Sequence, residues 1–351
     1  MSEVVGSGTA DTPASIDVHA HCVPLEVIDQ LAADERRFGI EVVERDGRWR
    51  VVIAGKIDAG PLHSGLTDMR RRLSVMDATG VDVQLLSSWI DLTAYALPAD
   101  TGARYARMFN EALVGTAAEH PRRFATLCTV PLQSPDAAAA ELRHAVAELG
   151  MAGVEIATTV AGRDLDDPGL GPFWAAAEEL QCLVLLHPCA SLAGRGVSRY
   201  FLGNLVGNPA ESTIALGHLI FGGVLERHPD LRLCAVHGGG FAPFQAGRWD
   251  HAYRGDVRGA AAHLTRPPSE WLSRLYYDTV LHSQRSLQML LGMVGPEQVV
   301  LGSDYPFEMG DPDPLATIAA VPGLAEGERQ QIRSGNLLGL LARVRRPEPA
   351  S

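Results

Sequence analysis

The segment "SIDVHAHCVP", residues 15–24, contains an apolar run that ends in two histidines separated by one alanine. The run has the composition of a buried strand, in which residues i and i+2 point to the same side. His19 and His21 would therefore reach into one small volume at the strand end. Two neutral imidazoles that converge on one point form half of a metal site. The alternative is that one histidine is exposed past the strand and the other caps it, so the rest of the chain has to decide.

The size and composition of the chain predict one soluble α/β domain. Its 351 residues, 46% of them hydrophobic, fall within the range of a single α/β barrel. The net charge of −12 argues against nucleic acid or an acidic membrane as a partner. The beginning of the chain has neither a basic nor an apolar signal region, and no run of apolar residues is long enough to span a bilayer, which predicts a cytoplasmic protein. The five cysteines are odd in number and have no C-x-x-C spacing, so we expect them to be reduced.

Short apolar runs bounded by turn residues recur along the chain and predict its strands. They cover residues 16–19, 81–87, 124–130, 153–157, 183–187, 231–237, 275–280 and 299–303. Segments with helical character lie between most of them, at residues 101–121, 136–150, 171–181, 211–229 and 283–295. Alternating strands and helices imply a parallel sheet, and eight such units imply a closed (β/α)8 barrel, the TIM barrel.

The segment at about residues 24–66 is too long for one loop between a strand and a helix. It contains "IEVVERDGRWRVVIAG", which predicts a hairpin around Asp46 and Gly47. We therefore expect a small β insertion after the first strand, folded over the barrel mouth, and a closing helix at residues 325–343. The whole chain, residues 1–351, is predicted to be one barrel domain. Arg70, Arg71 and Arg72 lie on a predicted helix and are expected to form a solvated face or an interface.

Polar residues collect at the C-terminal ends of the predicted strands, where this fold carries its chemistry. His187 ends the fifth strand, His237 ends the sixth, and Asp304 follows the eighth. Together with His19 and His21 they place four histidines and one carboxylate at one mouth. A divalent metal with nitrogen and oxygen ligands explains this set, with Zn²⁺ favoured and Mn²⁺ or Fe²⁺ as the alternatives.

With these residues at its strand ends, the chain resembles the amidohydrolase superfamily. Within it, the chain is similar to the branch typified by aminocarboxymuconate-semialdehyde decarboxylase and the metal-dependent hydroxybenzoate decarboxylases. The resemblance covers nearly the whole chain and rests on "DVHAH", "GVDVQLLS", "VPLQ", "LLHP", "HGGGF", "RPPSE", "YYDT" and "LGSDYPF", in this order. It implies that His19, His21, His187 and Asp304 bind the metal, while His237 stays unliganded and acts as an acid/base. It also implies a homodimer in which Arg248, eleven residues past His237, reaches into the neighbouring site.

The lysine content bears on the number of metals. Several superfamily members bridge two metals with a carboxylated lysine at the end of the fourth strand. This chain has a single lysine, Lys56, and it lies in the insertion. The fourth predicted strand reads "GVEIATT" and has no lysine to serve as the bridge. Glu155 is the alternative bridging group, but in mid-strand it is expected to face a neighbouring barrel layer or a helix. We predict one metal.

The resemblance and the residues together predict an enzyme, a metal-dependent nonoxidative decarboxylase of a small aromatic or unsaturated carboxylic acid. Metal-held substrate or metal-activated water would fix the reactive geometry, with His237 and Asp304 in acid/base roles. The alternative is a hydrolase or hydratase acting on a lactone, an amide or a vinylogous acid. Trp89 and Phe307 are expected to stack on a flat substrate, with plain packing as the competing interpretation.

The chain departs from the resemblance at Gly60. The muconate-semialdehyde enzymes carry a carboxylate-binding arginine at this position, before Pro61. Arg48, Arg50 or Lys56 could replace that arginine, or the substrate has one carboxylate fewer.

Overall fold

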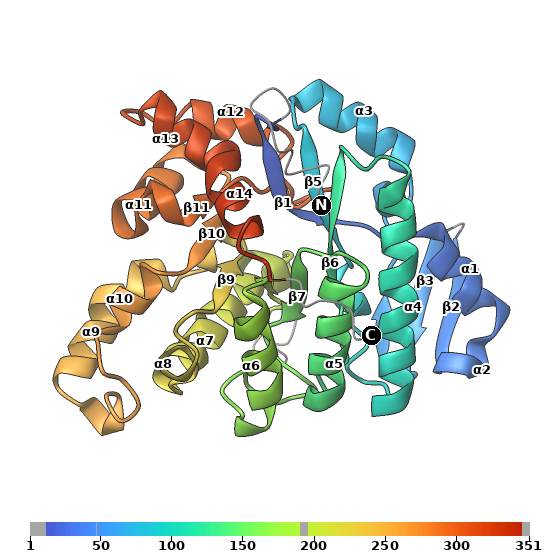
Figure 1. Cartoon of the computed structure of the whole chain (residues 1–351), viewed down its shortest axis with the longest axis horizontal. Helices are drawn as coiled ribbons and strands as arrows, with labels where there is room; N and C mark the ends of the chain where they lie inside the picture. The colour runs from blue at the N-terminus through green and yellow to red at the C-terminus, as the bar shows by residue number, and fades with distance from the viewer. Residues whose placement is uncertain (1–11, 47, 190–195, 346–351) are drawn as a thin grey trace.

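A computed structural model describes residues 12–46, 48–189 and 196–345, and its centre is a barrel of eight parallel strands (Figure 1). In order around the sheet these are β1 (Ile16–His21), β5 (Val83–Ser87), β6 (Phe124–Cys128), β7 (Gly153–Ala157), β8 (Leu183–His187), β9 (Arg232–Ala235), β10 (Tyr276–Asp278) and β11 (Val299–Val300). Main-chain hydrogen bonds from Val18 to Leu301 (2.9 Å) and from Asp304 to His19 (2.8 Å) close the seam between the first and last strands. The predicted barrel is confirmed.

The strands form where the apolar runs are buried on both faces, as in other parallel sheets. Every residue of β6, β7 and β8 is buried. One apolar cluster joins Val18, Leu185 and Val300 from different strands, and Leu337 and Leu340 of α14 (Asn336–Leu341) pack onto it. The barrel therefore has its own core, independent of the polar residues at the strand ends.

Helices surround the strands, with α4, α5 and α6 side by side in Figure 1. The helices that follow the insertion are α3 (Met69–Thr79), α4 (Ala99–Ala118), α5 (Pro135–Ala147), α6 (Gly171–Leu180), α7 (Asn208–Phe221), α8 (Val224–Arg227), α9 (Ala246–Arg254), α10 (Pro268–Leu272), α11 (Gln284–Val294), α12 (Pro314–Ala319), α13 (Glu326–Gln330) and α14. The helix predicted at residues 211–229 is divided into α7 and α8, because Gly223 adopts a left-handed φ of 72°. The predicted closing helix contains a π turn at residues 331–335.

The insertion after β1 consists of α1 (Leu25–Ala33), α2 (Glu35–Phe38), β2 (Ile40–Arg45), β3 (Arg48–Ile53) and β4 (Ile57–Ala59). As predicted, β2 and β3 form an antiparallel hairpin, with Arg45 opposite Arg48; Gly47 lies outside the described residues. The ring of Phe38 lies 6.1 Å from that of Tyr105 on α4, so the insertion is anchored to a barrel helix. The assignment of residues 1–351 to one domain stays a prediction.

The expectation of a solvated arginine face is wrong for one of the three residues concerned. Arg70 and Arg71 are exposed, whereas Arg72 is fully buried. The helical repeat places Arg72 on the same face of α3 as Met69 and Met76, and this face packs inward.

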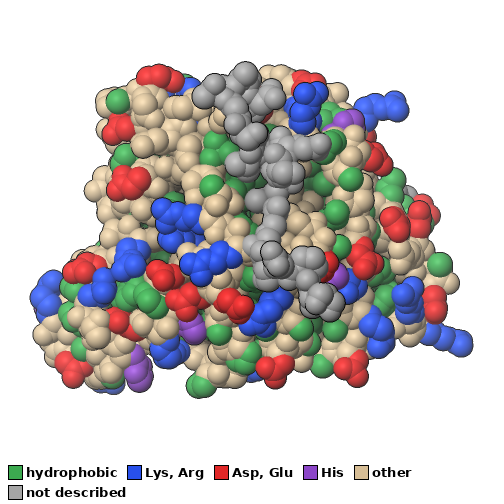
Figure 2. Space-filling view, viewed as in Figure 1, with side chains coloured by type: hydrophobic (Ala, Val, Ile, Leu, Met, Phe, Trp, Pro, Cys, Tyr) green, Lys and Arg blue, Asp and Glu red, His purple; other side chains and the backbone are tan. Residues whose placement is uncertain are grey.

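Acidic and basic side chains are interspersed on the face that Figure 2 presents. Among the described residues, no helix combines the length and the apolar character needed to cross a bilayer.

Candidate metal centre

The structure brings four of the predicted site residues together at the mouth of the barrel. Their ligand atoms all lie within 4.8 Å of one another, and all four residues are buried. His19 and His21 belong to the end of β1, His187 is the last residue of β8, and Asp304 follows β11. Strands at distant points of the sequence thus deliver their end residues to one point, as the parallel barrel requires.

Hydrogen bonds fix the tautomer of each imidazole. Nδ1 of His21 lies 2.8 Å from the carbonyl oxygen of Ser88, and Nδ1 of His187 lies 2.8 Å from that of Pro188. Nδ1 of His19 lies 2.7 Å from Oδ2 of Asp278. A carbonyl or carboxylate oxygen accepts and does not donate, so each Nδ1 carries the hydrogen. In the neutral rings, all three Nε2 atoms are left with a free lone pair.

These lone pairs face one another, which tests whether a metal fits. Nε2 of His19 lies 3.1 Å from Nε2 of His21, and Oδ1 of Asp304 lies 3.2 and 3.3 Å from the two nitrogens. Nε2 of His187 and Oδ1 of Asp304 are buried and have no hydrogen-bond partner among the described residues. With all three rings neutral these acceptors repel one another, and a bound cation, either a proton on His19 or a metal ion, removes that repulsion. Three imidazoles and a carboxylate are a donor set that suits Zn²⁺ and other first-row divalent ions.

The charges of the ligands agree with this assignment. Burial lowers the pKa of His187 well below its usual value, which keeps this ring neutral and able to coordinate. Burial acts the same way on His19, but the carboxylates of Asp304 and Asp278 outweigh it and raise the pKa of His19 well above the usual value. Burial would raise the pKa of Asp304, yet the neighbouring histidines hold it well below its usual value. The site therefore attracts positive charge at the point where the lone pairs meet.

His237 lies beside this group without belonging to it. Its Nε2 is 3.4 Å from Oδ2 of Asp304, and 17% of its side chain is exposed to the adjoining cavity. The chain turns sharply here, with φ of 53° at His237 and 64° at Gly240. A Cβ at Gly240 would lie 2.1 Å from the carbonyl oxygen of Pro209, so packing in this turn requires the last glycine of "HGGG".

A cavity of about 1070 Å³ opens from His187, His237 and Asp304 to the surface. Trp89 and Phe307 lie in its wall with ring centroids 5.7 Å apart, and contact of these rings with substrate stays a prediction. The insertion contributes Arg48, Trp49 and residues 60–64 to the same wall.

Arg248 lies outside the described lining of this cavity. It is exposed on α9.

Sequence reasoning missed Asp278, which orients His19 and whose Oδ1 also accepts hydrogen bonds from the main chain of Gly238 (3.0 Å) and Val280 (3.2 Å). The signal was present, because Asp278 ends β10 and strand-end polar residues identified the other members of the site.

Glu155 is fully enclosed within the barrel, where its Oε1 lies 3.7 Å from Nδ1 of His21. Burial raises the pKa of Glu155 to about 7. In the described part of the chain, the four-residue group is the only cluster of at least three histidine, cysteine or acidic residues that could hold a metal. Glu155 is outside that group.

Comparisons with known proteins agree with the geometry. Residues 16–337 match the family model described as Amidohydrolase. The chain is 32% identical over 282 residues to the 2-amino-3-carboxymuconate-6-semialdehyde decarboxylase of Dictyostelium discoideum, covering 80% of this chain and 78% of the relative. It is 30% identical over 258 residues to the gamma-resorcylate decarboxylase of Rhodococcus jostii, covering 68% and 77%. The crystal structure of 5-carboxyvanillate decarboxylase from Sphingomonas paucimobilis superposes with a TM-score of 0.80 at 25% identity, covering 94% of this chain and 99% of that one.

Proposed function

This chain belongs to the amidohydrolase family, and on that premise we propose that it is a metal-dependent nonoxidative decarboxylase of a small aromatic or unsaturated carboxylic acid. The observation that carries the proposal is the buried group of three histidines and Asp304, with His237 unliganded beside it in one cavity. The three similar proteins named above are all decarboxylases, which supports decarboxylation over other reactions of similar sites.

We propose one divalent metal per chain, bound by His19, His21, His187 and Asp304. Zn²⁺ is favoured by the nitrogen-rich donor set, with Mn²⁺ and Fe²⁺ as alternatives. When bound, the metal would supply Lewis-acid stabilisation of negative charge on a substrate oxygen.

His237 is proposed as the residue that moves the proton. Its protonated imidazole donates H⁺ to the carbon that bears the carboxylate. The bond from that carbon to the carboxylate then breaks, CO₂ leaves, and the electron pair of the broken bond restores the double bond or aromatic ring. His237 is left neutral and regains a proton from solvent, with Asp304 holding its Nε2 edge at 3.4 Å. The substrate has exchanged CO₂ for H, so atoms and charge balance.

The charges in the cavity wall favour a substrate with one carboxylate. Arg48 is the only arginine or lysine among the described lining residues, whereas Asp29 and Glu308 add negative charge. Of the three residues considered as substitutes for an arginine at position 60, only Arg48 lies among the described residues of the cavity wall. Arg50 is instead paired with Asp58, to which its Nε donates at 2.8 Å. The rings of Trp89 and Phe307 suit a flat, conjugated acid.

The packing and backbone conformation at Gly60 also disfavour a longer side chain. A Cβ there would lie 3.0 Å from Cα of Arg50, and the φ of Gly60 is 143°. An arginine at this position would therefore require Arg50 of β3 to shift.

We further propose a homodimer in which Arg248 completes the site of the neighbouring subunit. An exposed apolar area supports it, because Ile214 of α7 and Phe241 are 43% and 42% exposed and lie at adjoining positions, the main chain of Phe241 donating to Oγ1 of Thr213. Helix α9 with Arg248 follows Phe241 closely in the chain. Arginine suits this role because its planar fork grips a carboxylate through two hydrogen bonds.

A cytoplasmic location also stays a prediction, in keeping with five cysteines that are all free.

The test is a substrate screen with the metal-loaded and the metal-stripped protein. Hydroxybenzoates and related monocarboxylic acids are assayed for CO₂ release, with lactones and amides assayed in parallel for hydrolysis. We expect CO₂ from at least one hydroxybenzoate with the loaded protein alone. Turnover of lactones or amides without CO₂ release from any acid would overturn the proposal.

A further inference from the structure

Arg72 is an unusual residue because its guanidinium is fully buried next to the metal centre. Its Nη2 donates to the main-chain carbonyl of His21 and, at 3.2 Å, to that of Gly65. Its Nη1 donates to Oε1 of Gln84 at 3.1 Å, and the guanidinium lies 4.6 Å from the ring centroid of Tyr305. The side chain thus contacts the main chain of one proposed ligand and the residue that follows another, Asp304.

Gln84 extends this contact to the base of the site. Its Nε2 donates to Oδ2 of Asp17 at 2.9 Å. Oδ1 of Asp17 in turn accepts hydrogen bonds from the main-chain nitrogens of His19 and Ser303, both at 3.0 Å, and the hydroxyl of Ser303 donates to Oδ2. Asp17, Gln84 and Ser303 are all buried, so water does not substitute for these bonds.

The network spans the seam at which the barrel closes. His19 and His21 lie on the β1 side, and Ser303, Asp304 and Tyr305 lie on the other. Across the seam the main chain makes few contacts, among them the hydrogen bond from His21 N to Tyr305 O (2.8 Å) and that from Asp304 N to His19 O (2.8 Å). Asp17 bonds both sides of the seam, while Arg72 bonds the carbonyl of His21 on one side and contacts the ring of Tyr305 on the other. Three of the four proposed ligands belong to these two segments.

The charges of the network call for an explanation beyond packing. Arg72 and Asp17 are opposite charges, both fully buried, and the neutral amide of Gln84 lies between them. Removing both groups from water costs desolvation free energy, since each side chain is fully buried. An apolar residue at position 72 would avoid that cost, as happens when buried ion pairs are replaced.

We infer that Arg72 is a positioning residue for the metal centre. It holds the main chain of His21 directly. It holds the main chain of His19 and Asp304 indirectly, through the hydrogen bonds of Gln84, Asp17 and Ser303. The inference rests on the proposed metal site. Outer groups that hold ligands in place typically govern metal affinity, and here the held groups are main-chain atoms of the ligands themselves.

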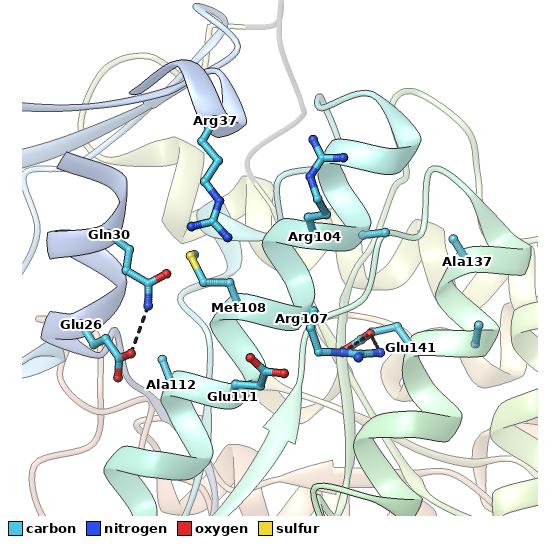
Figure 3. Close-up of a pocket in the computed structure, with 12 residues that line it drawn as sticks. Glu26, Gln30, Arg37, Arg104, Arg107, Met108, Glu111, Ala112, Ala137 and Glu141 are labelled. Carbon is cyan, nitrogen blue, oxygen red and sulfur yellow. Dashed lines mark hydrogen bonds and ion pairs between the residues drawn. The ribbon is translucent and has the colours of Figure 1, made fainter. Parts of the chain in front are cut away.

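The test compares Arg72→Met and Arg72→Lys with a matched control, Arg107→Met. Arg107 lies on α4, on the outside of the barrel, where its guanidinium bonds the buried Glu141 of α5 (Figure 3). Both arginines therefore bond buried groups, and Arg72 alone touches the metal ligands. Co²⁺ is the probe, because its visible absorption reports ligand geometry and its affinity can be measured by competition with a chelator. Thermal unfolding of the metal-free proteins is measured alongside.

We expect Arg72→Met to weaken Co²⁺ binding about 10- to 100-fold and to change the Co²⁺ spectrum. Arg107→Met should lower the melting temperature without changing affinity or spectrum. Arg72→Lys should also weaken binding, because one ammonium cannot span the carbonyls of His21 and Gly65 together with Gln84. It serves as the test if the methionine variant does not fold.

The inference is overturned if a folded Arg72 variant retains wild-type affinity and spectrum, whatever its melting temperature. A wild-type protein that binds no Co²⁺ would instead refute the metal site, and the inference with it.

Discussion

Replacement of Asp278 by asparagine should weaken metal binding by His19, although none of the four proposed ligands is itself replaced. In the native protein, Oδ2 of Asp278 accepts the Nδ1 hydrogen of His19 at 2.7 Å, and both side chains are fully buried. An asparagine can retain its oxygen where Oδ1 accepts from the main chain of Gly238 and Val280. Its amide then points hydrogens at His19, which must shift its own hydrogen to Nε2, the atom that faces the metal position.

The size of the effect follows from this change of tautomer. Loss of a group that orients a ligand typically weakens metal binding about 10- to 100-fold, which corresponds to about 1.4–2.7 kcal/mol. Zn²⁺ affinity is measured by chelator competition, with Asp58→Asn as the control, since Asp58 is a half-exposed partner of Arg50 in the insertion. A Zn²⁺ affinity for Asp278→Asn equal to that of the wild type would show that the Asp278 contact does not set the tautomer, and the reasoning would be wrong.

Three further predictions concern the ligands, the proton donor and the subunit contact. His187→Ala should yield a folded protein with little metal and no activity, measured by elemental analysis and circular dichroism; two metals in the wild type would contradict the mononuclear site. His237→Ala should keep its metal and lose roughly 10²- to 10⁴-fold in kcat, and an unchanged rate or loss of metal would reassign the residue. Mixing Arg248→Ala with His237→Ala should restore activity in heterodimers, since one of their two sites would be intact, and no recovery despite heterodimer formation would rule out a role across the interface.

The sequence predicted the barrel well because each strand is a short apolar run that ends at a turn, a pattern set by burial on both faces. The ligands followed from the same rule, since His187 and Asp304 come directly after such runs. Asp278 satisfies the rule in the structure, where it ends β10, but the predicted strand covered residues 275–280 and so placed Asp278 inside the run instead of at its end.

Other features depend on contacts that no local pattern encodes. Three consecutive arginines resemble a solvated surface, and the burial of Arg72 became evident only from the packing of the face of α3 that it shares with Met69 and Met76. Gly60 could be recognised as a departure from a family pattern, but its packing against Arg50 depends on how the hairpin folds back. The contact of Arg48 with the cavity depends on the same hairpin.

Turnover in D₂O, followed by mass spectrometry and NMR of the product, tests the central claim most directly. With a hydroxybenzoate substrate and the metal-loaded protein, the account predicts one CO₂ released per product molecule and one deuterium on the carbon that carried the carboxylate. The metal-stripped protein should form none of this product. A product that keeps its carboxylate and gains the elements of water would contradict decarboxylation and assign the site to hydration or hydrolysis.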